Sequence, residues 1–243
     1  LKQEDIVVGR IGQPIVGKWS PLILDTFGEL CNLNADVKLL LVGAPEDIQK
    51  LAMDSPFSKK IIIVNQINND AELARYYSLI DIFCHISTQG ESFGMVLTEA
   101  MLCKTPIITF ATPWADNSQG EIIGHEEGGL VAYDRKQFTK KLYDLVVNKK
   151  KRELLGENGR KRVIQQYQAR ILAKRCLLFI KNKPKINFDI SQKEILLSNA
   201  EYTFLSKVII YFNLDYNFLR LTTGFWNVGD LFKNIHHKIM KQH

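Results

Sequence analysis

The chain has 243 residues, of which 46% are apolar and 24% are charged, and its formal net charge is +6. These values are ordinary for a globular protein with one large domain or two small ones. No apolar run approaches the roughly 20 residues that a membrane-spanning helix needs, and no signal peptide is visible. The four cysteines lie far apart without a CxxC pair, which argues against a zinc site or a disulfide framework. We therefore expect free thiols in a reducing, cytoplasmic compartment.

The net charge conceals an uneven distribution. Residues 1–134 contain 9 Lys or Arg and 18 Asp or Glu, whereas residues 135–243 contain 23 and 8. A basic second half suggests an anionic partner surface, either lipid headgroups or nucleic acid, and solvated helix faces are the alternative. The chain begins at Leu1 rather than Met and runs almost at once into a strand. We interpret it as a piece of a longer protein.

The first part of the chain alternates short apolar runs with helical patterns. The runs are rich in Ile, Val and Leu without strict alternation, which is typical of strands covered on both faces. Helices are expected over residues 22–33, 48–53 and 71–79. Strand–helix alternation at this pitch predicts an α/β fold with a doubly wound parallel sheet, in which ligands bind beyond the carboxyl ends of the strands. The six expected strands are residues 5–11, 37–42, 60–65, 81–87, 106–110 and 129–132.

Each of these helices has a start signal. Ser20 and Pro21 suit the N-cap and first positions of the helix over residues 22–33. Asp70 precedes the helix over residues 71–79 and is expected to open it. Two acids after Pro45 favour the first turn of the helix that follows, because the helix dipole attracts negative charge there.

After Asp134 the strand pattern stops, and residues 136–147, 150–167 and 169–180 are expected to form basic helices. We predict a domain boundary at residues 181–185, which separates an α/β domain over residues 1–185 from a helical extension over residues 186–243. The extension holds 10 of the 24 aromatic residues. Its basic, amphipathic segments suggest contact with an anionic membrane surface. Packing on the domain or on a missing half is the alternative.

The most informative stretch is residues 85–101. An apolar strand leads through a loop into a helix that starts near Phe93 and Gly94. Unpaired backbone amides at such a start bind phosphate oxygens, and a glycine leaves room for the ligand. The helix dipole contributes only about 0.3–1 kcal/mol, or up to ~2 when partly buried. A diphosphate would therefore need side-chain cations as well.

Two carboxylates flank this helix start. Glu91 lies in the loop before the helix, and Glu99 lies about one and a half turns into it. A carboxylate accepts two hydrogen bonds, which suits the vicinal hydroxyls of a sugar or a ribose. An exposed loop acid and a helix-surface acid are the alternative interpretation.

Glu91 and Glu99 are separated by seven residues, with Ser-Phe-Gly after the first and Ala-Met after the second. This pattern resembles the signature of retaining glycosyltransferases of the GT-B fold, in the large family 4 group. Several motifs in register make this resemblance more specific than the two glutamates alone. It extends over roughly residues 5–180 and includes Val8-Gly9-Arg10 with Lys18, residues 39–43, residues 71–81, Pro106-Ile107-Ile108 and residues 120–123.

The resemblance implies the C-terminal, donor-binding domain of an enzyme that transfers a sugar from a nucleoside-diphosphate sugar to a glycan or lipid-linked acceptor. Arg10 and Lys18 would bind the diphosphate and stabilise the leaving group as its charge develops. Glu91 would contact the transferred sugar, and Glu99 the ribose. Arg10, Lys18 and Glu91 are the implied catalytic residues. The other implied donor-binding residues are Gly9, Asn65, Gln66, Ser92, Phe93, Gly94, Met95 and Leu97.

The resemblance has further implications for cofactors and partners. Asn65 and Gln66 would lie near the base. No metal or other cofactor is expected, in agreement with the lack of an Asp-x-Asp motif. The N-terminal GT-B domain, which binds the acceptor and in many relatives supplies a histidine, is missing from this sequence. His85 is no obvious substitute, and we interpret it as a structural residue at the end of a strand.

The sequence also departs from the family pattern. Many relatives have glycine after the lysine, where this chain has Trp19. The loop over residues 111–119 is longer and more polar than usual, and either donates hydrogen bonds to the donor sugar or forms a capped turn. Residues 12–19 nearly match a phosphate-binding P-loop, but Trp19 occupies the position of the hydroxyl that binds magnesium and Pro14 removes a backbone donor. We therefore do not expect a P-loop ATPase.

Other functions remain open at this point. This half alone would be a binding module if it bound nucleotide sugars and transferred nothing without an acceptor domain. A GT-B epimerase or phosphorylase is a second enzymatic alternative, which product analysis would distinguish. Nucleic-acid binding by the basic helices is the weakest option, so no nucleic-acid partner is predicted. A cytoplasmic enzyme, peripheral at the inner face of a membrane, is the location that we expect.

Overall fold

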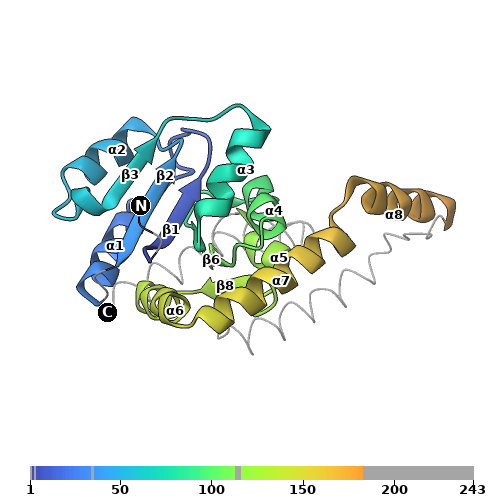
Figure 1. The fold of residues 1–243 in the computed structure, drawn as a ribbon. Helices are drawn as coiled ribbons and strands as arrows, with labels where there is room; N and C mark the ends of the chain where they lie inside the picture. The colour runs from blue at the N-terminus through green and yellow to red at the C-terminus, as the bar shows by residue number, and fades with distance from the viewer. Residues whose placement is uncertain (1, 3, 34–35, 113–115, 183–243) are drawn as a thin grey trace, which may run out of the picture.

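The computed structural model describes residues 2, 4–33, 36–112 and 116–182. Its centre is a sheet of six parallel strands in the order β3-β2-β1-β4-β6-β8 (Figure 1). All six strands lie where the sequence predicts them, with bounds that differ by at most two residues. They are β1 (Ile6–Ile11), β2 (Val37–Val42), β3 (Ile61–Val64), β4 (Ile82–His85), β6 (Ile107–Phe110) and β8 (Gly129–Ala132).

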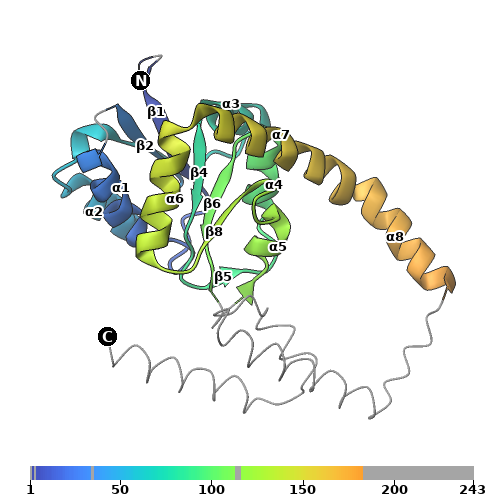
Figure 2. The same ribbon diagram turned by 90° about the horizontal axis from the view of Figure 1, so that it is seen from below.

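Helices cover both faces of this sheet (Figure 2). One hydrophobic core lies between the sheet and the helices α1 (Leu22–Leu33), α2 (Glu46–Met53) and α6 (Arg135–Val147). A second core lies on the opposite face, under α3 (Asp70–Leu79), α4 (Met95–Leu102) and α5 (Gln119–Ile123). The doubly wound α/β fold is thus confirmed. Most strand residues are apolar because side chains on both faces of the sheet are buried.

The two C-terminal helices of the described chain differ in their packing. Helix α7 (Lys149–Gln166) contributes Leu155 to the first core and Val163 to the second. Helix α8 (Ala169–Asn182) follows it and points away from the sheet (Figures 1 and 2). None of the described helices combines the length and the hydropathy needed to cross a membrane. The predicted boundary at residues 181–185 lies largely, and the extension over residues 186–243 entirely, outside the described residues, so both stay predictions.

Local hydrogen bonds explain where the helices begin. The Ser20 hydroxyl accepts a hydrogen bond from the Leu22 amide at 3.3 Å, as expected for the start of α1. The prediction for α3 was wrong by one residue, because Asn69 is the N-cap and its Oδ1 accepts from the Glu72 amide at 2.9 Å. Asp70 is the first helical residue instead.

Four short elements were not predicted. A 3₁₀ turn, η1 (Ser58–Lys60), precedes β3. Strands β5 (Gly90–Glu91) and β7 (Asp116–Asn117) form a two-stranded parallel ladder, and α5 follows β7 directly. The short ladder has no apolar alternation to signal it in the sequence, because it depends on pairing between two loops. It fixes the backbone of Glu91.

The strand order changes direction between β1 and β4. Strands β1 and β4 are neighbours in the sheet, but the chain reaches β2 and β3 on one side before it crosses back to β4. At such a point the connections after the two strands diverge, and a crevice opens at their carboxyl ends. The topology therefore places a ligand site beyond Ile11 and His85, the last residues of these strands.

Candidate functional site

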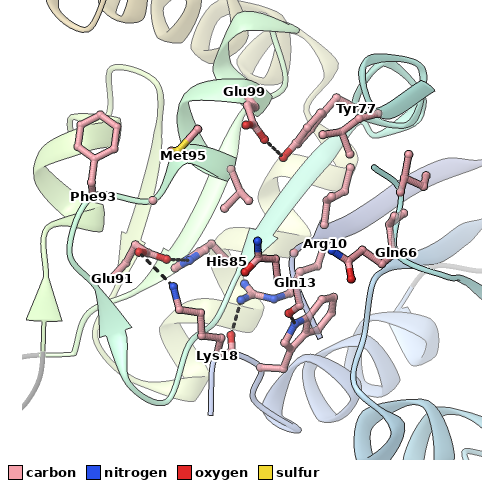
Figure 3. A pocket seen from close by; sticks show the side chains of 18 of the residues that line it. Arg10, Gln13, Lys18, Gln66, Tyr77, His85, Glu91, Phe93, Met95 and Glu99 are labelled. Carbon is pink, nitrogen blue, oxygen red and sulfur yellow. Dashed lines mark hydrogen bonds and ion pairs between the residues drawn. The ribbon is translucent and has the colours of Figure 1, made fainter. Parts of the chain in front are cut away.

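A cavity of about 480 Å³ lies at this switch point, and we call it the switch-point pocket (Figure 3). It is bounded by the carboxyl ends of β1 and β4, the loop after β1, the segment that leads into α4, and helix α3. Most of the residues that the sequence predicts for the donor site meet here. The polar or predicted residues that line it include Arg10, Gln13, Lys18, Gln66, Tyr77, His85, Glu91, Ser92, Phe93, Gly94, Met95 and Glu99.

Arg10 lies near the end of β1 and is only 4% exposed, so it is not a surface charge. Its Nη2 donates a hydrogen bond to the Lys18 carbonyl at 2.5 Å, and its guanidinium lies 4.8 Å from the centre of the Trp19 ring. Its Nε has no hydrogen-bond partner among the described residues, and none of their carboxylates lies within 4.0 Å of the guanidinium. Burial lowers the pKa of Arg10 to about 10, and Glu91 partly opposes this shift. A buried cation with a free donor is suited to an anionic ligand.

Trp19 explains one departure from the family pattern. Its ring is buried against Arg10, and its Nε1 donates to the Gln13 carbonyl at 2.9 Å, so it closes the loop after β1. Helix α1 begins at Leu22, beyond this tryptophan. A P-loop instead leads directly from its glycine-rich turn into a helix N-terminus. The geometry agrees with the prediction that residues 12–19 are not an ATPase motif.

The loop after β1 is attached to the loop after β4. The Gly17 carbonyl accepts hydrogen bonds from the backbone amides of Thr88 and Gln89, each at 3.2 Å, and from the Thr88 hydroxyl. Gly17 has a φ of +86°, and a Cβ there would collide with the Gln89 side chain. Only glycine therefore fits, and the attachment fixes Lys18 beside Glu91.

Glu91 faces two basic side chains. Its Oε1 lies 3.9 Å from Lys18 Nζ, and its Oε2 lies 3.6 Å from His85 Nε2. These neighbours lower the pKa of Glu91, with His85 making the largest contribution. The carboxylate is therefore ionised at neutral pH. It presents acceptor oxygens to the switch-point pocket.

His85 is 1% exposed and lies at the end of β4, as the prediction of a structural residue requires. It nevertheless lines the switch-point pocket, which that interpretation did not foresee. Its Nδ1 lies 3.2 Å from the Thr109 hydroxyl of β6, whereas its Nε2 is buried without a hydrogen-bond partner among the described residues. Burial lowers the pKa of His85 to about 4, so the ring is neutral at pH 7. In the sequence, its position at the end of an apolar strand was the signal that could have placed it at the site.

The start of α4 lies on the opposite side of the pocket from the β1 loop (Figure 3). Gly94 is its N-cap, with a left-handed backbone at φ +76° and ψ +71°. A Cβ at Gly94 would lie 2.7 Å from Glu91 Cγ and 2.8 Å from Leu97 Cδ1, so a larger residue would displace both. The first amides of a helix have no partner within it, and the first two residues of α4, Met95 and Val96, line the pocket.

Glu99 lines a different side of the pocket from Glu91 (Figure 3). Its Oε2 accepts a hydrogen bond from the Tyr77 hydroxyl at 2.7 Å. Burial is the main reason that the pKa of Tyr77 is raised, and the charge of Glu99 adds to it, so the phenol stays protonated and acts as a donor. Tyr77, which sequence reasoning did not single out for the site, thereby orients Glu99.

The comparisons with known proteins agree with this geometry. The family described as "Glycosyl transferases group 1" matches residues 6–162, which is more than half of the chain. The chain belongs to the glycosyl transferase group 1 family. It is 26% identical over 174 residues to the capsular polysaccharide biosynthesis glycosyltransferase CapM of Staphylococcus aureus. The aligned region covers 71% of this chain and 45% of CapM.

A second relative matches a smaller part of this chain. The chain is 30% identical over 103 residues to the phosphatidyl-myo-inositol mannosyltransferase of Mycobacterium leprae, over 42% of this chain and 27% of that one. The chain thus spans less than half the length of these two curated relatives.

Solved structures show the same fold. The C-terminal domain of a glycosyl transferase group 1 protein, LpcC, from Francisella tularensis superimposes with a TM-score of 0.58 at 21% identity, over 68% of this chain and 87% of that one. Anabaena HepE in complex with UDP-glucose gives a TM-score of 0.62 at 15% identity, over 73% of this chain and 49% of that one. The domain is therefore a Rossmann-like C-terminal domain of the GT-B fold.

Three residues predicted for donor binding do not line the switch-point pocket. Gly9 packs against Ile80, where a Cβ would overlap its side chain, and Leu97 is fully buried in the core under α4. Asn65 lines a neighbouring cavity of about 640 Å³, beside the start of α2, and Gln66 lines both cavities. Gly9 and Leu97 face the core because of their positions along β1 and α4.

The loop over residues 111–119 is partly described, since residues 113–115 lie outside the described residues. Gln119 Nε2 donates to the Phe110 carbonyl at 2.8 Å and to the Thr112 hydroxyl at 2.9 Å. The Thr112 amide donates to Asn117 Oδ1 at 2.8 Å. The described polar groups thus bond mainly within the loop, which favours the capped turn over donation to the sugar. The Ser118 amide donates to the Glu91 carbonyl at 3.0 Å and attaches this turn to the site.

Proposed function

We propose that this chain is the donor-binding half of a retaining glycosyltransferase that uses a nucleoside-diphosphate sugar and a glycan or lipid-linked acceptor. The observation that carries the proposal is the buried Arg10, whose guanidinium has a free Nε and faces the switch-point pocket. Taking this charge out of water costs free energy that no described carboxylate contact offsets. A diphosphate would supply the missing negative charge.

The other groups of the pocket suit the remaining parts of such a donor. Lys18, with its side chain about half exposed, would contact the diphosphate from the loop after β1. The start of α4 would add backbone donors and a dipole on the other side. Together these groups would stabilise the negative charge that develops on the leaving diphosphate. Because protein cations supply this charge, we propose that transfer requires no metal ion.

The two glutamates would bind hydroxyl groups at different ends of the donor. Glu91, beside Lys18, would accept hydrogen bonds from the transferred sugar. Glu99, oriented by Tyr77, would accept them from the ribose. Retention of the anomeric configuration is proposed from the resemblance of the signature. NMR analysis of the first product formed would test it, since an inverted anomer would contradict it.

Calorimetry tests the donor site directly. The chain is titrated with UDP, GDP, UDP-glucose and GDP-mannose, and we expect one nucleotide series to bind. Glu99→Ala should weaken binding by about 1–3 kcal/mol, because it removes hydrogen bonds to a charged acceptor. Glu153→Ala, an exposed acid on α7, is the control and should bind like the wild type. Binding of none of the four nucleotides, or unchanged affinity in Glu99→Ala, would contradict the assignment.

A nucleotide-sugar-binding module is the second candidate. It would use the same switch-point pocket, whose residues suit nucleotide binding whether or not transfer follows. The two functions differ in turnover. Transfer or donor hydrolysis by the chain supports an enzyme, whereas nucleotide-dependent thermal stabilisation without turnover supports a module that needs a separate acceptor domain.

A further inference from the structure

The buried Nε2 atom of His85 has no role in the donor site as described so far. This nitrogen has no hydrogen-bond partner among the described residues, and the ring lines the switch-point pocket. A buried polar atom without a partner costs about 1–3 kcal/mol, so its position calls for a function. The Glu91 carboxylate lies 3.6 Å from this nitrogen.

The surroundings of His85 determine which nitrogen carries the proton. Nδ1 faces the Thr109 hydroxyl at 3.2 Å, and a hydroxyl either donates or accepts. Nε2 faces a carboxylate oxygen, which only accepts when ionised. A lone pair on Nε2 would therefore be repelled by Glu91, whereas an N–H there is attracted. This fixes the neutral ring with its proton on Nε2, and Thr109 then donates to Nδ1.

The charged groups around the ring keep it neutral. Arg10 from β1 and Lys18 from the loop after β1 disfavour a second proton, and burial disfavours it more strongly. Glu91 from β5 favours a second proton but does not overcome the other effects. A neutral donor beside an ionised acceptor orients that acceptor without cancelling its charge.

We propose that His85, held by Thr109, is a positioning residue that directs the Glu91 carboxylate toward the transferred sugar. The distance of 3.6 Å is slightly long for a hydrogen bond, and a shift of a few tenths of an ångström closes it. Thr109 on β6, His85 on β4 and Glu91 on β5 then form one chain of contacts from the sheet to the pocket (Figure 3 shows the His85–Glu91 contact). This inference rests on the proposed function of Glu91 as a ligand of the sugar.

Calorimetry with three variants tests the proposal on the whole chain. Thr109→Val removes only the hydroxyl, His85→Leu removes both ring nitrogens, and His85→Gln restores a donor. The quantity compared is the affinity for UDP-glucose relative to UDP, and for GDP-mannose relative to GDP. His85→Leu should reduce this ratio about tenfold, as expected for one hydrogen bond to a charged group. Thr109→Val should reduce it less, and His85→Gln should recover most of it.

The nucleotide alone is the internal control. A purely structural role for His85 would weaken UDP and UDP-glucose, or GDP and GDP-mannose, by the same factor in His85→Leu. Either that result, which leaves the affinity ratio unchanged, or a failure of His85→Gln to recover the ratio would overturn the proposal. Melting curves of the three variants identify any that do not fold, and Thr109→Val, which keeps the side-chain shape, is then the deciding variant.

A second measurement does not depend on donor binding. Carboxyl ¹³C NMR follows the ionisation of Glu91, whose signal is assigned by its disappearance in Glu91→Gln. Because His85 lowers the pKa of Glu91, His85→Leu should raise it, and His85→Gln should raise it less. An unchanged pKa of Glu91 would overturn the positioning role. If the wild type binds none of the four nucleotides while this shift is present, the proposed function fails and the His85–Glu91 contact stands.

Discussion

Arg10 and Arg152 show how the same residue type, buried in one domain, serves two purposes. Arg152 on α7 is 9% exposed, and its Nη1 donates to the carbonyls of Leu145 and Val146 at 2.8 and 2.7 Å. These bonds complete the end of α6. Arg10 donates to the carbonyls of Lys18 at 2.5 Å and Cys84 at 3.5 Å, and its buried Nε has no hydrogen-bond partner among the described residues. The bonds of Arg152 serve the fold, whereas Arg10 lines the pocket and leaves capacity for a ligand.

Replacing each arginine by methionine separates these purposes. Arg10→Met should weaken nucleoside-diphosphate binding about 10- to 100-fold, because it removes charge-assisted hydrogen bonds to the ligand. Its free energy of unfolding should change by less than about 1 kcal/mol, since a buried charge is replaced by an apolar chain. Calorimetry and urea unfolding measure the two quantities.

Arg152→Met is the matched control. It should lower the free energy of unfolding by about 1–3 kcal/mol, because two buried carbonyls lose their donor, and should leave nucleotide affinity unchanged. Equal nucleotide affinity in the wild type and Arg10→Met would remove Arg10 from the site.

His85 gives stability a dependence on pH. Its pKa in the folded chain is about 4, below the ordinary value of 6.5, so the unfolded chain binds more protons between these values. The stability of the fold should therefore fall as the pH is lowered from 6.5 to 4, by about 3 kcal/mol from this residue alone. Urea unfolding at pH 7 and pH 5 of the wild type and His85→Gln measures it. The variant should lose less stability on acidification, and an identical loss would contradict a buried, neutral ring.

At the scale of elements, the short β5–β7 ladder determines where Glu91 lies. Gly90 pairs with Asp116 and has a φ of +72°, and a Cβ there would overlap the Asp116 carbonyl. Gln119, which begins α5, stabilises the turn on the other side through Phe110 and Thr112. Two loops from different parts of the chain thus hold one carboxylate, and neither resembles a strand when taken alone.

A glycine-to-alanine pair tests the ladder. Gly90→Ala should cost about 1–3 kcal/mol of unfolding free energy, because the alanine is strained in the left-handed region and disrupts the pairing. It should also lower the affinity for a nucleoside-diphosphate sugar more than that for the nucleotide, since Glu91 follows Gly90. Gly120→Ala in α5 is the control.

A Cβ at Gly120 would lie 3.6 Å from Val131 Cγ2, an ordinary contact, and alanine is the better helix former by about 1 kcal/mol. Gly120→Ala should therefore unfold at the same or a higher urea concentration. If Gly90→Ala were as stable as the wild type, the ladder would not constrain Glu91.

At the scale of the whole molecule, the described chain ends in a basic helix that leaves apolar side chains exposed. Leu172, Leu177 and Leu178 of α8 are exposed, and Arg170, Lys174 and Arg175 lie among them in sequence. Together with the aromatic-rich residues 186–243, this composition is typical of segments that bind anionic bilayers. It would suit an enzyme at the inner face of a membrane whose acceptor is lipid-linked.

Co-sedimentation with vesicles tests this location. The full chain should bind vesicles that contain phosphatidylglycerol, bind less as salt is raised, and ignore pure phosphatidylcholine, because the attraction is electrostatic. Deletion of residues 186–243 should reduce the binding. Equal binding after the deletion, or none by the full chain, would show that these aromatic residues serve another purpose.

From the sequence alone we could predict the six strands, most of the helices and the crevice at the strand ends, because each strand is a largely apolar run and parallel order follows from strand–helix alternation. The motifs also placed Arg10, Lys18, Glu91 and Glu99 in one region. The packed structure was needed to show that Arg10 is buried beside Trp19, that His85 lies beside Glu91, and that Asn65 lies in a neighbouring cavity. These facts depend on the register between segments far apart in the chain. Local pattern carries no information about such contacts, whereas the packed sheet fixes them.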